Sequence, residues 1–449
     1  MTNHSIPHED MSHISPNELI ASVSRRQSMK IGMLGGLGVG LADMLRLEAN
    51  ASPLQGVAGR AKSVILLWLQ GGLSHHDTFD MKPETTEEIR GEFMPIPTNL
   101  PGYHVSELMP KLARCMDKMA VIRSMTHKEA AHQRGCMYMV EGRQPPKATG
   151  VEASGHPHLG SVVSHLLGNR NGLPAYVSIP GNDFTSRFVG TGFLPVSCAS
   201  FKQTQVKSLS SAGTQMTPER LSHRVQLLRS LDTGIDTARQ RFGDAWDQFS
   251  EQAIDIVTSG KAAAAFDINQ EPQSVRDAYG ANGKNQIGDL CLRARRLVEA
   301  GVRFVTVGRN SWDHHSNIFS LIRGRLPRND QAIAALLNDL SERGMLDDTL
   351  VILASEFGRT PKVNKTAGRD HWPRVFSIAL SGAGIGMGQV IGASDKIGSD
   401  PIDDPVSPEE LAATILHLVG INPQTTVYRE GIRPAKLVDE AKPFQKLLA

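Results

Sequence analysis

The chain has little cysteine, few aromatic side chains and almost no net charge, and each shortage excludes a class of protein. Only four cysteines occur among 449 residues, far apart and without a C-x-x-C pair, so neither a zinc knuckle nor a dense disulfide framework is expected. The formal net charge is +2, which gives no electrostatic basis for a nucleic acid or an anionic membrane as the main partner. We therefore expect a soluble globular protein, with free thiols in preference to two disulfides at Cys115, Cys136, Cys198 and Cys291.

The N-terminus lacks a hydrophobic run long enough to span a membrane. The segment Ser24–Lys30 (SRRQSMK) contains a twin arginine, and a glycine-rich, weakly apolar stretch and an A-x-A sequence ending at Ala51 follow it. This order is typical of a twin-arginine export signal, and its apolar part is too short for a good transmembrane helix. Residues 1–51 are thus predicted to be an export leader that sends the folded protein to the periplasm or outside the cell; a disordered basic leader is the alternative. No transmembrane segment is expected in the mature chain.

Apolar runs with β propensity recur along the rest of the chain, and helical patterns lie between them. Several runs are apolar throughout, as expected for strands buried on both faces of a parallel sheet. The predicted strands are 63–69, 119–124, 175–179, 302–308, 349–355 and 375–381, and the predicted helices are 285–300, 330–343 and 407–420, the last with a capping box. Residues 60–440 are therefore predicted to form an α/β domain with a doubly wound, mostly parallel sheet flanked by helices. The polar residues 200–284, which hold no good strand, are predicted to be a helical insertion or lid.

Acids and histidines follow four of the predicted strands, where functional groups collect in open α/β sheets. A single cluster of this kind is more often a solvated turn than a set of ligands. Carboxylates and imidazoles that converge from several loops suit zinc, manganese, iron or magnesium, so a divalent metal is expected at this edge. In chain order the candidates are His75 and Asp77, then Thr126 (at an expected helix N-cap), His127 and His132, then Asp313 and His315, and finally Glu356, Arg359, Asp370 and His371.

Spacing suggests separate roles inside these clusters. In Asp313-His314-His315 the first and third side chains can face one point, so we expect His314 to turn away toward solvent or a supporting contact. Arg359 could bind a tetrahedral oxyanion through two hydrogen bonds; a salt bridge to Glu356 or Asp370 is an equally good alternative. The histidines of the HPH sequence at 156–158 open a predicted helix and are expected to anchor a loop; a substrate contact is the alternative.

Four ordered motifs carry a family resemblance: "GGLSHHDTFDMKP", "WDHHSN", "SEFGRTP" and "AGRDHWP". Together they resemble the bacterial exported proteins that share the domain of unknown function 1501, over nearly the whole chain. That family is similar in turn to the alkaline-phosphatase and sulfatase superfamily. The resemblance implies an alkaline-phosphatase-like sheet, divalent metal at the strand ends, and hydrolysis or transfer of a phosphate or sulfate ester. The ligands that it implies are Asp313, His315, Glu356 and His371, with His75 or Asp77 from the first strand.

The chain departs from the superfamily pattern at two points. Glu356-Phe357 stands where many members have an Asp-His pair, so one histidine ligand is missing, and Asp370, His127 or His132 is a candidate to replace it. No C-x-P-x-R motif occurs in the chain, which argues against formylglycine chemistry. Thr126 remains a candidate nucleophile, and His132 a candidate ligand, base or nucleophile.

The sequence thus predicts an exported metal-dependent hydrolase of phosphate or sulfate esters, acting on a small molecule or a glycan. Zinc, manganese, calcium or magnesium would polarise the ester, Arg359 would stabilise the oxyanion, and His127 or His132 would move a proton. The alternative is a non-catalytic metal-containing protein that binds sulfated or phosphorylated glycans, and the missing Asp-His pair and the absent sulfatase nucleophile motif both favour it. An α/β protein without a metal is the third interpretation.

Overall fold

The structure is a computed structural model that describes residues 59–146, 155–180, 189–203, 261–281, 286–309, 311–429 and 432–448. The predicted export leader, residues 1–51, lies outside the described residues. So does most of the predicted insertion 200–284, of which the described C-terminal part is helical.

A mixed, mostly parallel sheet of eight strands forms the centre of the fold, as predicted. Its strand order is β12-β4-β11-β8-β1-β7-β5-β6. All neighbours pair in parallel except β11, which runs antiparallel to both β4 and β8. The strands are β1 (Ser63–Leu69), β4 (Ala120–Met125), β5 (Tyr176–Ile179), β6 (Phe201–Lys202), β7 (Phe304–Arg309), β8 (Thr349–Ala354), β11 (Phe376–Ser381) and β12 (Gln389–Ile391).

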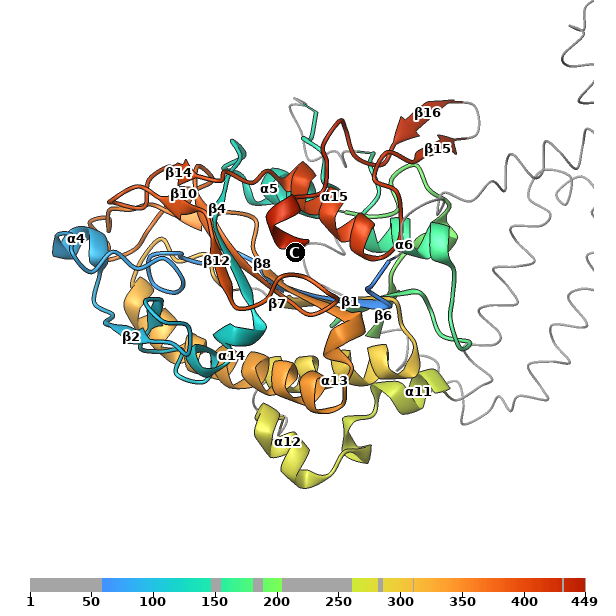
Figure 1. Cartoon of the computed structure of the whole chain (residues 1–449), viewed down its shortest axis with the longest axis horizontal. Coiled ribbons are helices and arrows are strands. Elements are labelled where there is room, and N and C mark those ends of the chain that lie inside the picture. Colours follow the sequence, from blue (N-terminus) through green and yellow to red (C-terminus); the bar gives the residue numbers. More distant parts are fainter. Residues whose placement is uncertain are drawn as a thin grey trace, which may run out of the picture. The chain divides into compact units, whose positions relative to one another are not determined.

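Helices cover both faces of the sheet (Figure 1). The helices α11 (Lys261–Phe266), α12 (Gln273–Tyr279), α13 (Gln286–Ala300) and α14 (Ile318–Glu342) lie on one face, and α5 (His132–Glu141), α6 (Leu159–Leu167) and α15 (Pro408–Leu418) lie on the other. Strand β1 is buried along its whole length because alternate side chains enter the two cores. Ile65 and Leu67 belong to the core beneath α13 and α14, whereas Leu66 and Trp68 belong to the core beneath α5 and α15.

The ends of several helices test the sequence-based expectations. The capping box that begins α15 is present, since Ser407 accepts from the backbone N–H of Glu410 and the Glu410 side chain accepts from that of Ser407. Helix α14 begins at Ile318, twelve residues before the predicted start. The predicted N-cap at Thr126 is wrong: α5 begins only at His132, its N-cap is Ala131, and the backbone N–H of Thr126 donates to Val406 instead.

Short elements complete the described part of the chain. They are α4 (Glu87–Arg90) and the two-stranded pairs β2 (Pro95–Pro97) with β3 (His104–Ser106), β9 (Gly358–Arg359) with β10 (His371–Trp372), β13 (Ala393–Ser394) with β14 (Pro401–Asp403), and β15 (Thr426–Arg429) with β16 (Ile432–Lys436). Single 3-10 turns lie at Leu112–Arg114, Met116–Lys118, Val196–Cys198, Ile268–Gln270, Leu346–Asp348 and Gln445–Leu447.

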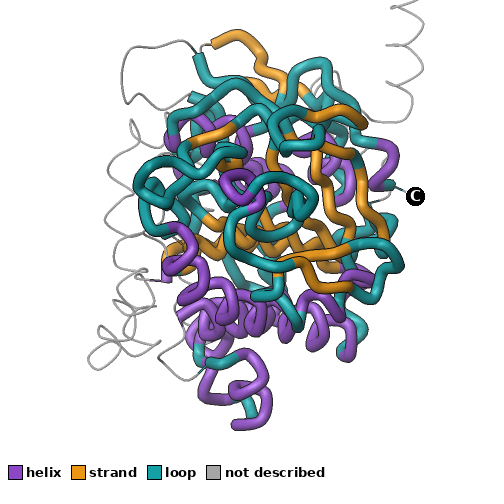
Figure 2. Tube along the Cα trace, turned by 90° about the vertical axis from the view of Figure 1, so that its left-hand side faces the viewer, coloured by secondary structure: helices purple, strands orange, loops and turns teal. Residues whose placement is uncertain are grey.

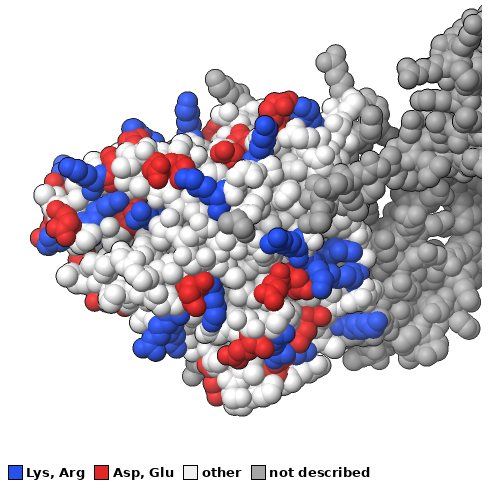
Figure 3. Space-filling model, in the orientation of Figure 1, with Lys and Arg blue, Asp and Glu red and all other residues white. Residues whose placement is uncertain are grey.

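Three further observations concern the described helices, the surface charges and the loops. Among the helices that the structure describes, none combines the length and the apolar composition needed to cross a membrane. On the face shown in Figure 3, basic and acidic side chains are interspersed. Figure 2 views the end of the molecule that carries β10, and loops cover much of that end.

Candidate metal centre

Five segments of the chain meet at the carboxyl edge of the parallel strands. The exits of β1, β4, β7 and β8 supply residues 70–72, 126–132, 311–315 and 355–359. Strand β11 runs the opposite way, so the residues that precede it reach this same edge. His371 lies on β10, just before β11, and pairs with Arg359 on β9. The antiparallel strand is therefore what brings His371 to the other candidate ligands.

Two glycines allow the loops to approach one another closely. Gly71 has a φ of +118°, and a Cβ on it would lie 2.3 Å from the backbone nitrogen of Asp313, so a side chain here would push the β7 exit away. A Cβ on Gly368 would lie 2.1 Å from the carbonyl of His315. Both glycines thus fix the positions of candidate ligands through backbone contact.

Asp313 lies at the centre of three histidine rings. Its Oδ2 is 3.1 Å from Nε2 of His132, and its Oδ1 is 2.9 Å from Nε2 of His315 and 3.1 Å from Nε2 of His371. The Nε2 atoms of His315 and His371 are 3.0 Å apart. Ligand atoms of His132, Asp313 and His371 all lie within 4.8 Å of one another. This donor set of imidazole nitrogens and a carboxylate fits a divalent transition-metal ion.

Each of the three rings is held from behind by an oxygen atom. Nδ1 of His132 lies 2.6 Å from Oε1 of Glu356, and Nδ1 of His315 lies 2.6 Å from Oδ1 of Asp370. Nδ1 of His371 donates to the carbonyl of Ala130 at 2.7 Å. Glu356 and Asp370, both expected as ligands from the sequence, therefore lie behind the histidines instead of in the ring of converging donor atoms.

Arg359 takes a place different from the oxyanion clamp that its sequence position suggested. Its side chain is fully buried, and its nitrogens donate to backbone carbonyls and to Oδ1 of Asp313 at 2.6 Å. The carbonyls belong to Gly71, Gly72, Trp312 and Arg369. Because every guanidinium nitrogen already donates inside the protein, Arg359 positions Asp313. Arg359 does form a salt bridge, but its partner is Asp313 instead of Glu356 or Asp370, which the sequence suggested.

The charges around the cluster perturb its pKa values. Burial alone would raise the pKa of Asp313, but the hydrogen bond and charge of Arg359 outweigh it and hold that pKa well below its usual range. Burial alone would lower the pKa of His132, but the hydrogen bond and charge of Glu356 outweigh it, so the pKa is raised. Burial lowers the pKa of His371. Asp313 is thus held ionised, as a metal ligand must be.

The cluster is open on one side and closed on the other. The side chains of Asp313 and His315 are 43% and 46% exposed, whereas those of Glu356 and Arg359 are fully buried. A small molecule can therefore reach the donor atoms from the side of Asp313 and His315.

Two other candidate ligands, His75 and Asp77, have partners elsewhere. His75 is buried and its Nε2 donates to the carbonyl of Gly398 at 2.9 Å. Asp77 is buried in an ion pair with Arg369, at 3.0 Å, and accepts from Ser74. The β1 exit supplies its glycine backbone to the cluster, while these side chains pack beneath it.

Two further candidates from the β4 exit also lie outside the ring of donors. His127 has both ring nitrogens engaged, since Nδ1 accepts from the backbone of Glu129 and Nε2 donates to the carbonyl of Glu356 at 2.7 Å. Burial lowers its pKa to about 4. Thr126 is half-buried, and its described hydrogen bond is the backbone one to Val406. His127 thus supports the backbone of Glu356, and no contact of Thr126 with the cluster is described.

Two other histidines occupy supporting positions that the sequence suggested. His314 turns away from the cluster toward Ser311 and Arg325. His158, the last residue of the HPH sequence, caps α6: its Nδ1 accepts from the backbone N–H of Gly160 at 2.8 Å.

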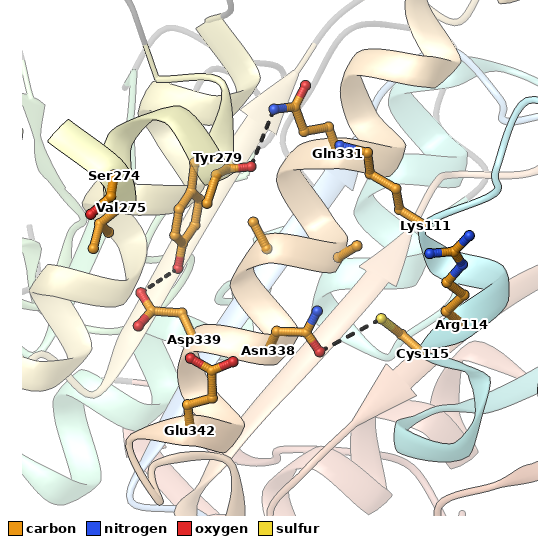
Figure 4. Close-up of a pocket in the computed structure, with 13 residues that line it drawn as sticks. Lys111, Arg114, Cys115, Ser274, Val275, Tyr279, Gln331, Asn338, Asp339 and Glu342 are labelled. Carbon is orange, nitrogen blue, oxygen red and sulfur yellow. Dashed lines mark hydrogen bonds between the residues drawn. The ribbon is translucent and has the colours of Figure 1, made fainter.

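A separate pocket of about 530 Å³ lies on the helical side of the domain (Figure 4). Its floor is α14, with Asn338 accepting from the thiol of Cys115, and Asp339 accepting from the Tyr279 hydroxyl at 2.8 Å. Its lining from α14 begins at Gln331, about 20 Å along the helix axis from the first residue of α14. None of the donor atoms of the cluster lines this pocket.

The chain was compared with protein families, with curated proteins and with solved structures. The sequence profile of the family described as "Protein of unknown function (DUF1501)" matches residues 61–448. None of the curated proteins matches the chain in sequence.

Similar solved structures include the alkaline phosphatase from the Antarctic bacterium TAB5, at 12% identity and a TM-score of 0.36, over 81% of this chain and 99% of that one. A second is the PsFucS1 sulfatase from Pseudoalteromonas sp., at 12% identity and a TM-score of 0.35, over 80% and 68%. A third is the lipoteichoic acid synthase LtaP from Listeria monocytogenes, at 9% identity and a TM-score of 0.36, over 83% and 78%.

Proposed function

The chain belongs to the DUF1501 family, and from its own residues we propose that it is a metal-dependent hydrolase of phosphate or sulfate esters. One observation carries this proposal: three histidine Nε2 atoms converge on the carboxylate of Asp313 at a solvent-open edge of the sheet. The ligands of the ion would be Asp313, His315 and His371, with His132 as the fourth donor.

The residues of the chain would hold and shape this centre. A divalent ion bound there would polarise an ester oxygen and lower the pKa of a bound water. Arg359 holds Asp313 in place and ionised. Glu356 and Asp370 hold the rings of His132 and His315. The ester would enter beside Asp313 and His315, the exposed members of the set.

Export belongs to the same proposal. The twin-arginine segment Ser24–Lys30 would direct the folded protein across the membrane, and phosphate or sulfate esters outside the cytoplasm would be its substrates.

A second candidate function is a metal-containing protein that binds sulfated or phosphorylated glycans without cleaving them. Two observations favour it. The Arg359 side chain is fully buried and each of its nitrogens already donates inside the protein. His315 joins the three residues whose ligand atoms lie within 4.8 Å of one another to give four donor side chains, the number that closes a structural zinc site.

The test combines elemental analysis of the purified protein with turnover of an aryl phosphate and an aryl sulfate. We expect bound metal and turnover of one ester, both lost in His371→Ala. The matched control is His104→Ala, because His104 is an exposed histidine on β3. Metal without turnover of either ester would favour the binding protein. Full metal content in His371→Ala would overturn the assignment of the site.

A further inference from the structure

The carboxylates of Glu356 and Asp370 lie behind the histidine rings and contact those rings, whereas the ligands would contact the ion. Oε1 of Glu356 receives the Nδ1 proton of His132 at 2.6 Å and the backbone N–H of Gly71 at 2.8 Å. The side chain is fully buried, between the exits of β1 and β4. Its other oxygen, Oε2, accepts from the Ser355 hydroxyl at 3.2 Å, and Glu356 is not among the residues whose ligand atoms lie within 4.8 Å of one another.

The same geometry fixes which nitrogen of each ring faces the ion. A carbonyl or an ionised carboxylate accepts and cannot donate, so the ring nitrogen opposite it carries the proton. Ala130 supplies a carbonyl to His371. Asp370 supplies a carboxylate oxygen to His315 at 2.6 Å. Each neutral ring then presents its Nε2 lone pair to the point where Asp313 lies.

Three lone pairs and a carboxylate at this separation repel one another unless a cation or an extra proton lies between them. The contact of 3.0 Å between the Nε2 atoms of His315 and His371 is the clearest case. Imidazole nitrogen is preferred by zinc and neighbouring transition metals, whereas calcium and magnesium prefer oxygen. The donor set therefore selects the first group.

We infer that the centre holds one transition-metal ion, bound by His132, Asp313, His315 and His371, with Glu356 and Asp370 as positioning residues that orient two of the ligands. The inference rests on the proposed metal site and not on ester hydrolysis. It assigns a different role to Glu356 and Asp370 from the ligand role that the sequence suggested. Removal of such a carboxylate weakens metal binding without changing the ligands.

The experiment measures metal binding directly. Chelator-stripped protein is titrated with Zn²⁺ against a chromophoric chelator, and Co²⁺ is added separately to record its visible absorption spectrum. The variants are Glu356→Gln and Asp370→Asn, which keep an oxygen acceptor for the histidine. The matched control is Glu129→Gln, because the Glu129 carboxylate lies on the same loop as Ala130 but pairs with Arg134.

We expect one equivalent of Zn²⁺ per chain in the wild type and in both variants, with affinity lowered about 10–100-fold in Glu356→Gln. Asp370 is 55% exposed, so Asp370→Asn should lower it less, by up to about 10-fold. The Co²⁺ spectrum should keep its shape in all variants because the ligands are unchanged. Glu129→Gln should bind as the wild type does.

Four results would overturn the inference, and the last of them is the absence of bound metal. Two equivalents in the wild type and one in Glu356→Gln would make Glu356 the ligand of a second ion. A changed Co²⁺ spectrum in Glu356→Gln would make it a ligand of the first. Unchanged affinity in Glu356→Gln would remove its positioning role. If the wild type binds metal as expected but cleaves no ester, the hydrolase proposal fails and this inference stands; if it binds no metal, both fail.

Discussion

Replacing Asp313 by Asn separates the two roles that the structure gives to this side chain. Asn has the same shape, so its oxygen can still accept from Arg359, as Oδ1 now does at 2.6 Å. Its amide group can donate to Nε2 of His132, which lies 3.1 Å from Oδ2. The variant should therefore fold with its contacts satisfied but without the negative charge.

The charge matters first for Arg359. Among the described residues Asp313 is the carboxylate with which this fully buried guanidinium pairs. Breaking a buried ion pair costs about 3–5 kcal/mol, but here the backbone carbonyls stay in place and Asp313 is 43% exposed. We expect a loss of about 1–3 kcal/mol in the free energy of unfolding. The structural unit has roughly 390 residues and an unfolding entropy of about 0.8 kcal/mol/K, so the stripped variant should melt about 1–4 °C lower.

The charge matters second for the ion. Free Zn²⁺ at 100 times its Kd stabilises a protein with one site by about 2.7 kcal/mol, which corresponds to a rise of about 3 °C here. The wild type should show this rise. Asp313→Asn should show almost none, because a neutral amide is a poor ligand for zinc.

The assay is calorimetry of stripped protein with and without Zn²⁺, with His104→Ala as the control for the loss of a surface histidine. An equal rise in Asp313→Asn and in the wild type would refute the ligand role of Asp313. A stripped variant as stable as the stripped wild type would refute its role as the counter-ion of Arg359. No rise in the wild type would refute the metal centre itself.

Two further predictions concern the helices on the face of the sheet that carries α5. Gly142 is the C-cap of α5, with a φ of +64°, and a Cβ on it would lie only 2.1 Å from that of Ala412. Gly142→Ala should therefore lower the free energy of unfolding, measured with denaturant, by about 2–4 kcal/mol. Adding Ala412→Gly should restore about 1–3 kcal/mol of this loss, and a strictly additive double variant would contradict the packing argument. His158 is buried, and burial lowers its pKa to about 3. Below about pH 6.5 the unfolded state therefore binds a proton that the folded state does not. The free energy of unfolding should fall as the pH falls from 7 toward 3, by about 2 kcal/mol at pH 5. His158→Asn keeps an N-cap acceptor but does not titrate, so its stability difference from the wild type should shrink by that amount between pH 8 and pH 5; a constant difference would exclude His158 as the source.

The sheet was largely predictable because its strands are buried on both faces. A run such as Ser63–Leu69 is apolar throughout, and that pattern distinguishes a central strand from an edge strand. The cap at Ser407 was predictable because the capping box is local chemistry within four residues. The direction of β11 was not, because an apolar run reads the same in a parallel and in an antiparallel strand.

That direction decides part of the site. His371 precedes β11, and it reaches the carboxyl edge of the other strands only because β11 runs backwards. In the sequence His371 was a candidate because it lies next to Asp370, and the reversed direction of β11 played no part in that prediction. The start of α5 is a similar case: no residue type marks Ala131 as an N-cap, so Thr126 was the better candidate by composition and the prediction was wrong.

Composition alone also could not show which acids and histidines at this edge are ligands and which are supporting residues. His75 and His371 both follow a glycine-containing loop, yet His75 is buried against Gly398 whereas His371 faces Asp313. Which side of a loop a side chain takes depends on contacts hundreds of residues apart in the chain. The sequence did place His132 among the candidates, in the same exit as Thr126 and His127, but no contact that the sequence shows ranked it above them as a ligand.

The number of donors connects the identity of the ion with the function of the centre. Three imidazoles and one carboxylate fill a tetrahedral zinc ion, and zinc in catalytic sites keeps a fourth position for water or substrate. A zinc ion in this cluster must therefore add a fifth ligand during hydrolysis or release one of the four. Asp313 is tied to the buried Arg359 and His132 to the buried Glu356, so these two are the least free to leave. An ion that accepts five or six ligands would have an open position from the start, on the exposed side of Asp313 and His315. The metal found in the purified protein thus bears directly on its function. A centre filled by four protein donors suits a binding protein, whereas an ion with a larger coordination number suits a hydrolase.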